Sequence, residues 1–156
     1  MEIIVVLLVV IADQFSKKLA VKYLMNQKPI EVIKNFMELH YVKNFGAAFG
    51  ILQNQRIFFI IMTSLVLGGL AGYLFKNSEK LTLFAKLAIS LLIGGALGNL
   101  IDRIRHGYVV DFIKVDLKIY NFPVFNVADM FIVVGTALLI FVVVFDRLEI
   151  NMGVDQ

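Results

Sequence analysis

The sequence predicts an all-α membrane protein, a bundle of four transmembrane helices with a small β-sheet on the membrane surface. Of the 156 residues, 60% are hydrophobic and only 17% are charged, whereas soluble domains are nearer half apolar and a quarter charged. Segments 55–75, 81–103 and 125–146 are each apolar over the roughly 20 residues that a helix needs to cross a bilayer. The length suits a single domain, 1–156, and the net charge of +3 suggests no nucleic-acid partner.

The first helix is expected at residues 2–24, although only its first half is fully apolar. Residues 3–12 are too few to span a bilayer, so the helix must continue through DQFSKKLAVKYL. Asp13 and Lys17 then stand four residues apart on one helix face, where they can form an ion pair. Charges at such depth normally face protein rather than lipid.

The two larger connections are expected to form the sheet. Four spans put both chain ends on one side of the membrane, and residues 29–50 and 108–124 on the other. PIEVI, MELHYVK and YVVDFIKV show two-residue alternation, and FPVF is also β-like. Lysine and arginine counts favour, by a small margin, a cytoplasmic position for these connections.

Small residues predict where helices approach closely. Gly68 and Gly72 on the second span, and Gly94 and Gly98 on the third, are each spaced four residues apart. Such pairs allow close packing of helices in lipid.

Polar residues gather toward the ends of the last two spans. Gly95, Asn99 and Asp102 follow the spacing of one helix face, and Arg103 comes next. A terminal ion pair between Asp102 and Arg103 is the simpler interpretation of that end.

Two further aspartates also have local interpretations. Asn126 followed by Asp129 has the spacing of a helix N-cap with an acid in the first turn. Asp111 could be a surface-strand residue.

Taken together, these residues favour acid–base chemistry. Asp111 and Asp129 fall on the same membrane face, near Asn44, Asn99 and Asn126. Two adjacent carboxylates cannot both ionise, so they share one proton, and one can activate water while the other polarises a carbonyl. The chain has no cysteine and only two histidines, far apart in sequence, so we expect no metal or other cofactor.

Four segments in this order resemble the bacterial lipoprotein signal peptidase family, signal peptidase II. They are DQFSK (13–17), KNFGAAFG (43–50), GGALGNLIDRIRHGYVVDFI (94–113) and FNVADMFIVVG (125–135). The resemblance implies an aspartyl membrane protease with four transmembrane helices and an extracytoplasmic β-cradle. Such an enzyme is an aspartic endopeptidase that removes the signal peptide from prolipoproteins whose lipobox cysteine carries diacylglycerol.

By motif, the resemblance assigns the catalytic dyad to Asp111 and Asp129. It implies a multi-pass protein of the bacterial cytoplasmic membrane, with the active site at the extracytoplasmic face and the termini in the cytoplasm. This orientation is the reverse of the one that the lysine and arginine counts favour. The expected partners are prolipoprotein substrates and membrane lipid, with no nucleic acid, and we expect the protein to be a monomer. The residues expected to support the dyad or contact substrate are Asn44, Gly46, Asn99, Asp102, Arg103, Asn126, Asp13 and Lys17.

Two other classes of protein remain open from the residues alone. A small transporter would distribute polar residues through the bilayer, and Asp13, Lys17 and Lys86 are candidates for deep charges. A scaffold with interfacial ion pairs would tolerate replacement of either Asp111 or Asp129.

Overall fold

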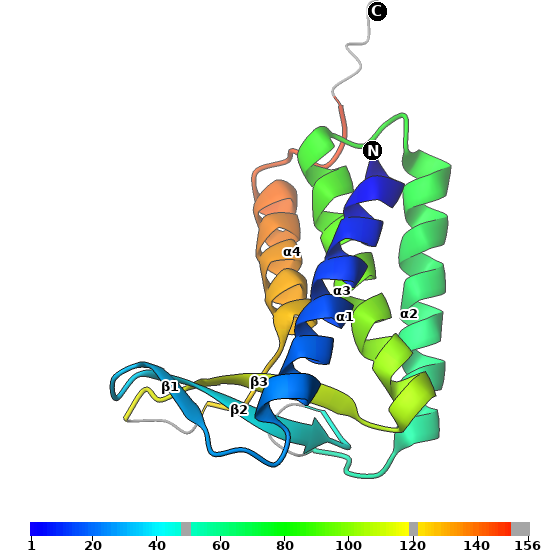
Figure 1. The fold of residues 1–156 in the computed structure, drawn as a ribbon. Coiled ribbons are helices and arrows are strands. Elements are labelled where there is room, and N and C mark those ends of the chain that lie inside the picture. The colour runs from blue at the N-terminus through cyan, green and yellow to red at the C-terminus, as the bar shows by residue number, and fades with distance from the viewer. Residues whose placement is uncertain (48–50, 119–121, 151–156) are drawn as a thin grey trace, which may run out of the picture.

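The computed structural model describes residues 1–47, 51–118 and 122–150. Within these residues, four helices run side by side and a small sheet lies across one end of them (Figure 1). Their ends fall within three residues of the predicted ranges; the largest difference is the third helix, predicted to end at 103, which continues to His106. In chain order the elements are α1 (Glu2–Leu24), β1 (Ile30–Ile33), β2 (Met37–Asn44), α2 (Arg56–Asn77), α3 (Leu83–His106), β3 (Val109–Val115) and α4 (Val127–Val144).

Helix α3 lies at the centre of the bundle and packs against the other three helices. Glycine allows this approach: a Cβ atom on Gly94 would lie 2.7 Å from Cβ of Val9 on α1. The prediction for Gly94 and Gly98 is therefore confirmed. The prediction for Gly68 and Gly72 is wrong, because a Cβ on either would meet no atom within 4 Å. Those two glycines lie on the face of α2 turned away from its neighbours.

The sheet is antiparallel, with the strand order β1-β2-β3. Strand β3 follows α3 directly, because Gly107 ends the helix in the left-handed conformation (φ 82°) and turns the chain into the strand. The three predicted strands are confirmed. FPVF, however, contributes only one isolated bridge, Phe125 to Ile113, rather than a strand. Ala20 and Leu24 of α1 pack on buried residues of β3, which fixes the sheet against the bundle.

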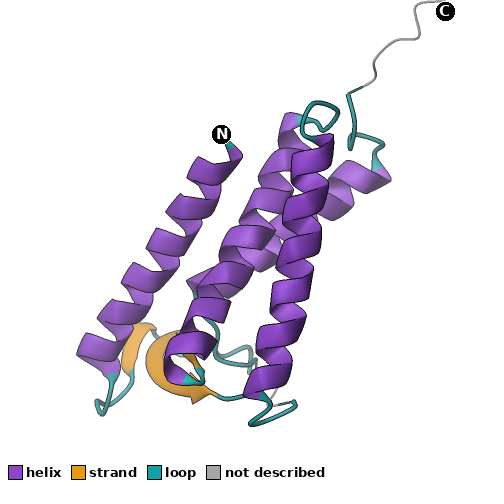
Figure 2. Cartoon of the chain, turned by 90° about the vertical axis from the view of Figure 1, so that its right-hand side faces the viewer, coloured by secondary structure: helices purple, strands orange, loops and turns teal. Residues whose placement is uncertain are grey.

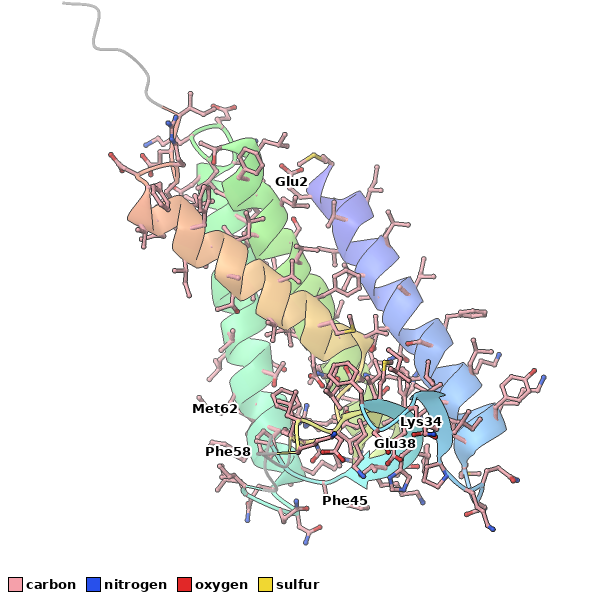
Figure 3. The ribbon with its side chains drawn as sticks, turned by 90° about the vertical axis from the view of Figure 1, so that its left-hand side faces the viewer. Glu2, Lys34, Glu38, Phe45, Phe58 and Met62 are labelled. Carbon is pink, nitrogen blue, oxygen red and sulfur yellow. The ribbon has the colours of Figure 1, made fainter. Side chains whose placement is uncertain are left out.

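Both ends of the described chain lie at the end of the bundle opposite the sheet (Figures 1 and 2). Figure 3 shows Glu2 far from Lys34, Glu38 and Phe45 of the sheet region. At the chain-end side, Glu2 pairs with Lys86 (3.7 Å). The sequence suggested that Lys86 is a deep charge. This prediction is wrong, because Lys86 lies near the chain-end side of the bundle.

Three of the helices in the described residues, α2, α3 and α4, are long and apolar enough to cross a membrane. Helix α1 is as long, at 23 residues, but Asp13, Lys17 and Lys18 interrupt its apolar sequence. The side chains of Asp13 and Lys17 are buried against the bundle, whereas Phe15 and other apolar residues of α1 face outward.

Candidate active site

Asp111 is a buried residue near the middle of β3, only 2% exposed. The register opposes Asp111 to Val42 on β2, so Asn44 is its diagonal neighbour on the same face of the sheet. Asn44 Nδ2 donates to Asp111 Oδ2 (2.9 Å), and Asn126 Nδ2 donates to Oδ1 (2.6 Å). The interpretation of Asp111 as a surface-strand residue is therefore wrong.

Asp129 lies in the first turn of α4, where it forms a capping box with Asn126. The backbone N–H of Asp129 donates to Asn126 Oδ1 (3.0 Å), and that of Asn126 donates to Asp129 Oδ2 (3.1 Å). The capping interpretation is confirmed, but it is incomplete. Asn99 of α3 also donates through Nδ2 to Asp129 Oδ1 (2.8 Å).

Asn126 connects the two aspartates. Its Nδ2 donates both to Asp111 and to Asn99 Oδ1 (3.1 Å), and its side chain is fully buried. Burial, followed by the negative charge of nearby Asp129, raises the pKa of the Asp111 carboxyl to about 7. The charge of Asp129 therefore disfavours ionisation of Asp111.

Both carboxylates line one open cavity of about 680 Å³. Its polar end is formed by the aspartates, three side chains that flank them and the start of the 45–55 connection. Its remaining wall is apolar, and Met130, Val133 and Val134 of that wall are about half exposed or more on the outer side of α4. The lining residues are Asn44, Ala47, Asn99, Arg103, Val109, Asp111, Phe122, Pro123, Val124, Phe125, Asp129, Met130, Ile132, Val133 and Val134.

Behind the aspartates lies a buried cluster of charges centred on Lys17. Its Nζ contacts Asp13 Oδ2 (2.9 Å), Asp102 Oδ2 (3.1 Å) and Asn99 Oδ1 (2.9 Å). Lys17, Asp13 and Asp102 are all at most 3% exposed. The predicted Asp13–Lys17 pair is confirmed, and it extends toward the site through Asn99.

The carboxylates of this cluster also bind backbone at the edge of the site. Asp13 Oδ1 accepts from the N–H of Ala128 on α4 (3.0 Å), and Asp102 Oδ2 accepts from the N–H of Val110 on β3 (3.0 Å). The cluster thus connects α4, which carries Asp129, to α1, and β3, which carries Asp111, to α3. The predicted ion pair between Asp102 and Arg103 is wrong, because Asp102 pairs with Lys17 instead.

Arg103 faces the connection that follows β2. Its Nη2 donates to the carbonyl of Gly46 (3.0 Å), and its guanidinium lies 4.7 Å from the ring centroid of Phe59. The N–H of Gly46 donates in turn to Asn44 Oδ1 (2.9 Å). A Cβ on Gly46 would lie 2.5 Å from the carbonyl oxygen of Ile51, so this position requires glycine. Of the segment KNFGAAFG, residues 48–50 lie outside the described residues.

Two contributing residues were missed from the sequence. Gln14 donates to Asp102 Oδ1 (2.9 Å) and to the carbonyl of Gly98 (3.2 Å); its place beside Asp13 was the available signal. Arg56 donates to the last carbonyls of α3, those of Arg103 and Ile104 (2.9 and 2.8 Å). A basic residue at a helix start opposes the helix dipole, and this anomaly could have indicated a partner elsewhere.

The aspartate and asparagine side chains at the site offer carboxylate and amide groups. Across residues 1–47, 51–118 and 122–150, no group of three histidine, cysteine, aspartate or glutamate side chains is arranged to hold a metal ion. What the site offers chemically is a pair of coupled carboxylates, fixed by amide donors, at the edge of an apolar-walled cavity.

These features define a class of protein: a multi-pass membrane protein with a paired-carboxylate site at one end of its helices. The family model for signal peptidase (SPase) II matches residues 5–145. The lipoprotein signal peptidase of Caldanaerobacter subterraneus is 50% identical over 145 residues, which span 93% of this chain and 97% of that protein. The chain therefore belongs to the signal peptidase II family, in agreement with the resemblance of its motifs.

Other comparisons agree. The lipoprotein signal peptidase of Halothermothrix orenii is 47% identical over 137 residues, covering 88% of this chain and 90% of that protein. A bacterial membrane enzyme solved by the in meso method is similar with a TM-score of 0.83 at 38% identity, covering 99% of this chain and 93% of its own. The similarity thus extends over the whole fold, sheet included.

Proposed function

We propose that the protein is a membrane aspartyl endopeptidase that removes the signal peptide from diacylglyceryl-modified prolipoproteins. It cleaves just before the lipidated cysteine, using a water molecule activated by Asp111 and Asp129. The observation that carries this proposal is the convergence of these two side chains, from β3 and α4, on one cavity. Their coupling, their amide donors and the family of the chain all support it.

In the proposed first step, Asp129 is ionised and Asp111 is protonated. Asp129 lies at the start of α4 and accepts two hydrogen bonds, an environment that stabilises negative charge. Burial and the charge of Asp129 raise the pKa of Asp111 to about 7, so Asp111 can hold a proton close to neutral pH. Asp129 takes a proton from a water molecule, and the oxygen of that water bonds to the scissile carbonyl carbon. Asp111 donates its proton to the carbonyl oxygen, which gives a neutral tetrahedral diol.

The second step reverses both proton transfers. Asp129 gives its proton to the amide nitrogen, and the carbon–nitrogen bond breaks. Asp111 removes a proton from one hydroxyl of the diol as the new carboxylic acid forms. The dyad is thereby returned to its starting state without any covalent intermediate on the protein.

The shape of the cavity suits a substrate held in lipid. Its apolar wall includes Met130, Val133 and Val134, which are exposed on the outer face of α4. Acyl chains of a diacylglyceryl group can therefore reach the site from the bilayer. Arg103 and the peptide at Gly46 stand at the polar end, where they can hold the substrate strand in extended form.

The membrane placement follows from the same geometry. Helix α1, of 23 residues, has a length of about 34 Å at 1.5 Å per residue, enough to span a bilayer core of about 30 Å. Its charges at Asp13 and Lys17 are buried against protein, so it can be the fourth span. We place the sheet and the dyad at the extracytoplasmic face of the cytoplasmic membrane, and both termini in the cytoplasm. The protein is expected to act as a monomer, because one chain supplies both carboxylates and the cavity.

The experiment is cleavage of a diacylglyceryl prolipoprotein by the purified protein in detergent. Asp111→Asn and Asp129→Asn should each abolish turnover in protein that remains folded, as judged by gel filtration and thermal unfolding. Lys114→Gln, which breaks only the half-exposed pair with Glu38 on the sheet, is the matched control and should cleave normally.

Substrate selectivity is tested in the same assay. The unlipidated precursor should be cleaved poorly, because it lacks the acyl chains that the apolar wall receives. Full turnover by either aspartate variant would show that the protein is not a dyad peptidase. Equal turnover of lipidated and unlipidated precursors would refute the proposed substrate class but leave the dyad intact.

A further inference from the structure

Three asparagines direct their amide groups at the two aspartates, and each has two possible orientations. Asn44 and Asn126 donate to Asp111, and Asn99 donates to Asp129. Rotating any of these amides by half a turn would place its oxygen against a carboxylate oxygen. The site therefore depends on what holds each amide with its nitrogen toward the aspartate.

Two of the three amides are held by backbone. Asn44 Oδ1 accepts from the N–H of Gly46, and Asn126 Oδ1 accepts from the N–H of Asp129. A backbone N–H can only donate, so in each case the amide oxygen must face it. These orientations are therefore set by the local chain conformation.

Asn99 is different, because side chains rather than backbone hold it: Asn126 Nδ2 donates to its Oδ1 at 3.1 Å, and Lys17 gives the shorter, charged contact to the same oxygen. Lys17 Nζ of α1 donates to Asn99 Oδ1 at 2.9 Å, and both side chains are buried. An ammonium group has three donors and no acceptor. From Asn99 this ammonium can take only the amide oxygen as a partner, which leaves Nδ2 pointing at Asp129 Oδ1.

We propose that Lys17 is a positioning residue for the dyad, acting through Asn99. By donating to Asn99 Oδ1, it fixes the amide so that Nδ2 donates to Asp129, the aspartate proposed to take the proton from water. Asp13 and Asp102 hold the ammonium in place from either side, at 2.9 and 3.1 Å. The buried cluster thus orients the catalytic machinery as well as linking the helices.

A purely structural role for Lys17 gives a different expectation. In that case its loss would lower stability and the amount of folded protein, but turnover by the folded fraction would be normal. The inference rests on the proposed peptidase activity, so Asp111→Asn is measured alongside. If that variant cleaves, the proposed function has failed; if only the Lys17 results disagree, the function stands and this inference alone has failed.

The key variant is Asp13→Asn combined with Lys17→Met. It removes one positive and one negative charge, so the net charge of the buried cluster is unchanged. An asparagine oxygen at position 13 can still accept from the N–H of Ala128. Lys18→Met is the matched control, because Lys18 is the exposed neighbour on the same helix.

Turnover of the lipidated substrate is compared for this double variant, for Asn99→Ala and for all three changes combined. We expect kcat to fall about 10- to 100-fold in each, by analogy with the losses seen when hydrogen bonds that orient metal ligands are removed, with KM within about threefold of the unchanged protein. Adding Asn99→Ala to the double variant should cause no further loss. Normal kcat in the folded double variant, or losses that multiply, would overturn the proposal.

If the double variant is not recovered folded, Asn99→Asp tests whether the orientation of the Asn99 amide matters. Its carboxylate accepts from Lys17 as the amide does, but it cannot donate to Asp129. We expect it to lose at least as much kcat as Asn99→Ala. Turnover near that of the unchanged protein would show that orientation of the Asn99 amide is irrelevant, and the role of Lys17 would be withdrawn.

Discussion

Replacement of Asn126 by alanine tests the centre of the site. The side chain is completely buried and makes three hydrogen bonds: it accepts from the N–H of Asp129 and donates to Asn99 and Asp111. Alanine removes all three contacts. The remaining backbone bond, from the N–H of residue 126 to Asp129 Oδ2, is retained.

The magnitude can be built from these contacts. Loss of an N-cap costs about 1 kcal/mol. Loss of a hydrogen bond to an acid that is charged for part of the time costs about 1.5–3 kcal/mol. Asn99 Oδ1 keeps its bond from Lys17, so that contact adds little. The free energy of unfolding should therefore fall by about 2.5–4 kcal/mol, and Tm by about 5–15 °C for a chain of this length.

The assay is thermal unfolding in detergent together with turnover at a temperature well below Tm. Asn126→Ser is the control, because serine restores the cap at the start of α4 but cannot reach across to Asp111. It should recover about 1 kcal/mol, the share that the cap contributes, while turnover stays low. A Tm shift below about 2 °C for Asn126→Ala, or normal turnover in Asn126→Ser, would refute the bridging role.

Two further predictions concern pH and helix packing. The pKa of Asp111 is raised in the folded protein, so the folded state binds a proton that the unfolded state releases between pH about 4 and about 7. Stability should fall as pH rises through this window, and Asp111→Asn should remove that part of the fall; parallel curves of Tm against pH would contradict the assignment. Gly94→Val should lower the free energy of unfolding by about 1–3 kcal/mol, because its Cβ meets Val9 at 2.7 Å. Gly72→Ala, whose Cβ would meet no atom within 4 Å, should not lower it and should raise it by up to about 1 kcal/mol, because alanine favours a helix over glycine; equal losses in the two would refute the packing.

Much of this architecture follows from local sequence. Apolar runs of membrane length set the helices, and two-residue alternation set the strands, because each pattern reflects the repeat of its own backbone. The Asp13–Lys17 pair was predictable for the same reason, since residues four apart share a helix face. The N-cap at Asn126 is also local.

Features that depend on helix rotation were not predictable. Successive helical residues point about 100° apart, so Asp102 faces Lys17 whereas Arg103 faces Gly46, and an ion pair between sequence neighbours was the wrong inference. Spacing alone also could not tell which glycine pair meets another helix. The capping of α3 by Arg56 joins residues 47 positions apart, and no local pattern shows such a contact.

The most direct test of the account is to detect the proton that we propose Asp111 and Asp129 share. Infrared difference spectra of the folded protein, recorded with isotope-labelled aspartate while pH is changed, report protonated carboxyl groups by their C=O stretch. The account predicts a protonated aspartate that titrates near pH 7 and disappears in Asp111→Asn. A spectrum in which all aspartates are already ionised at pH 5.5, or in which that signal survives in Asp111→Asn, would contradict it.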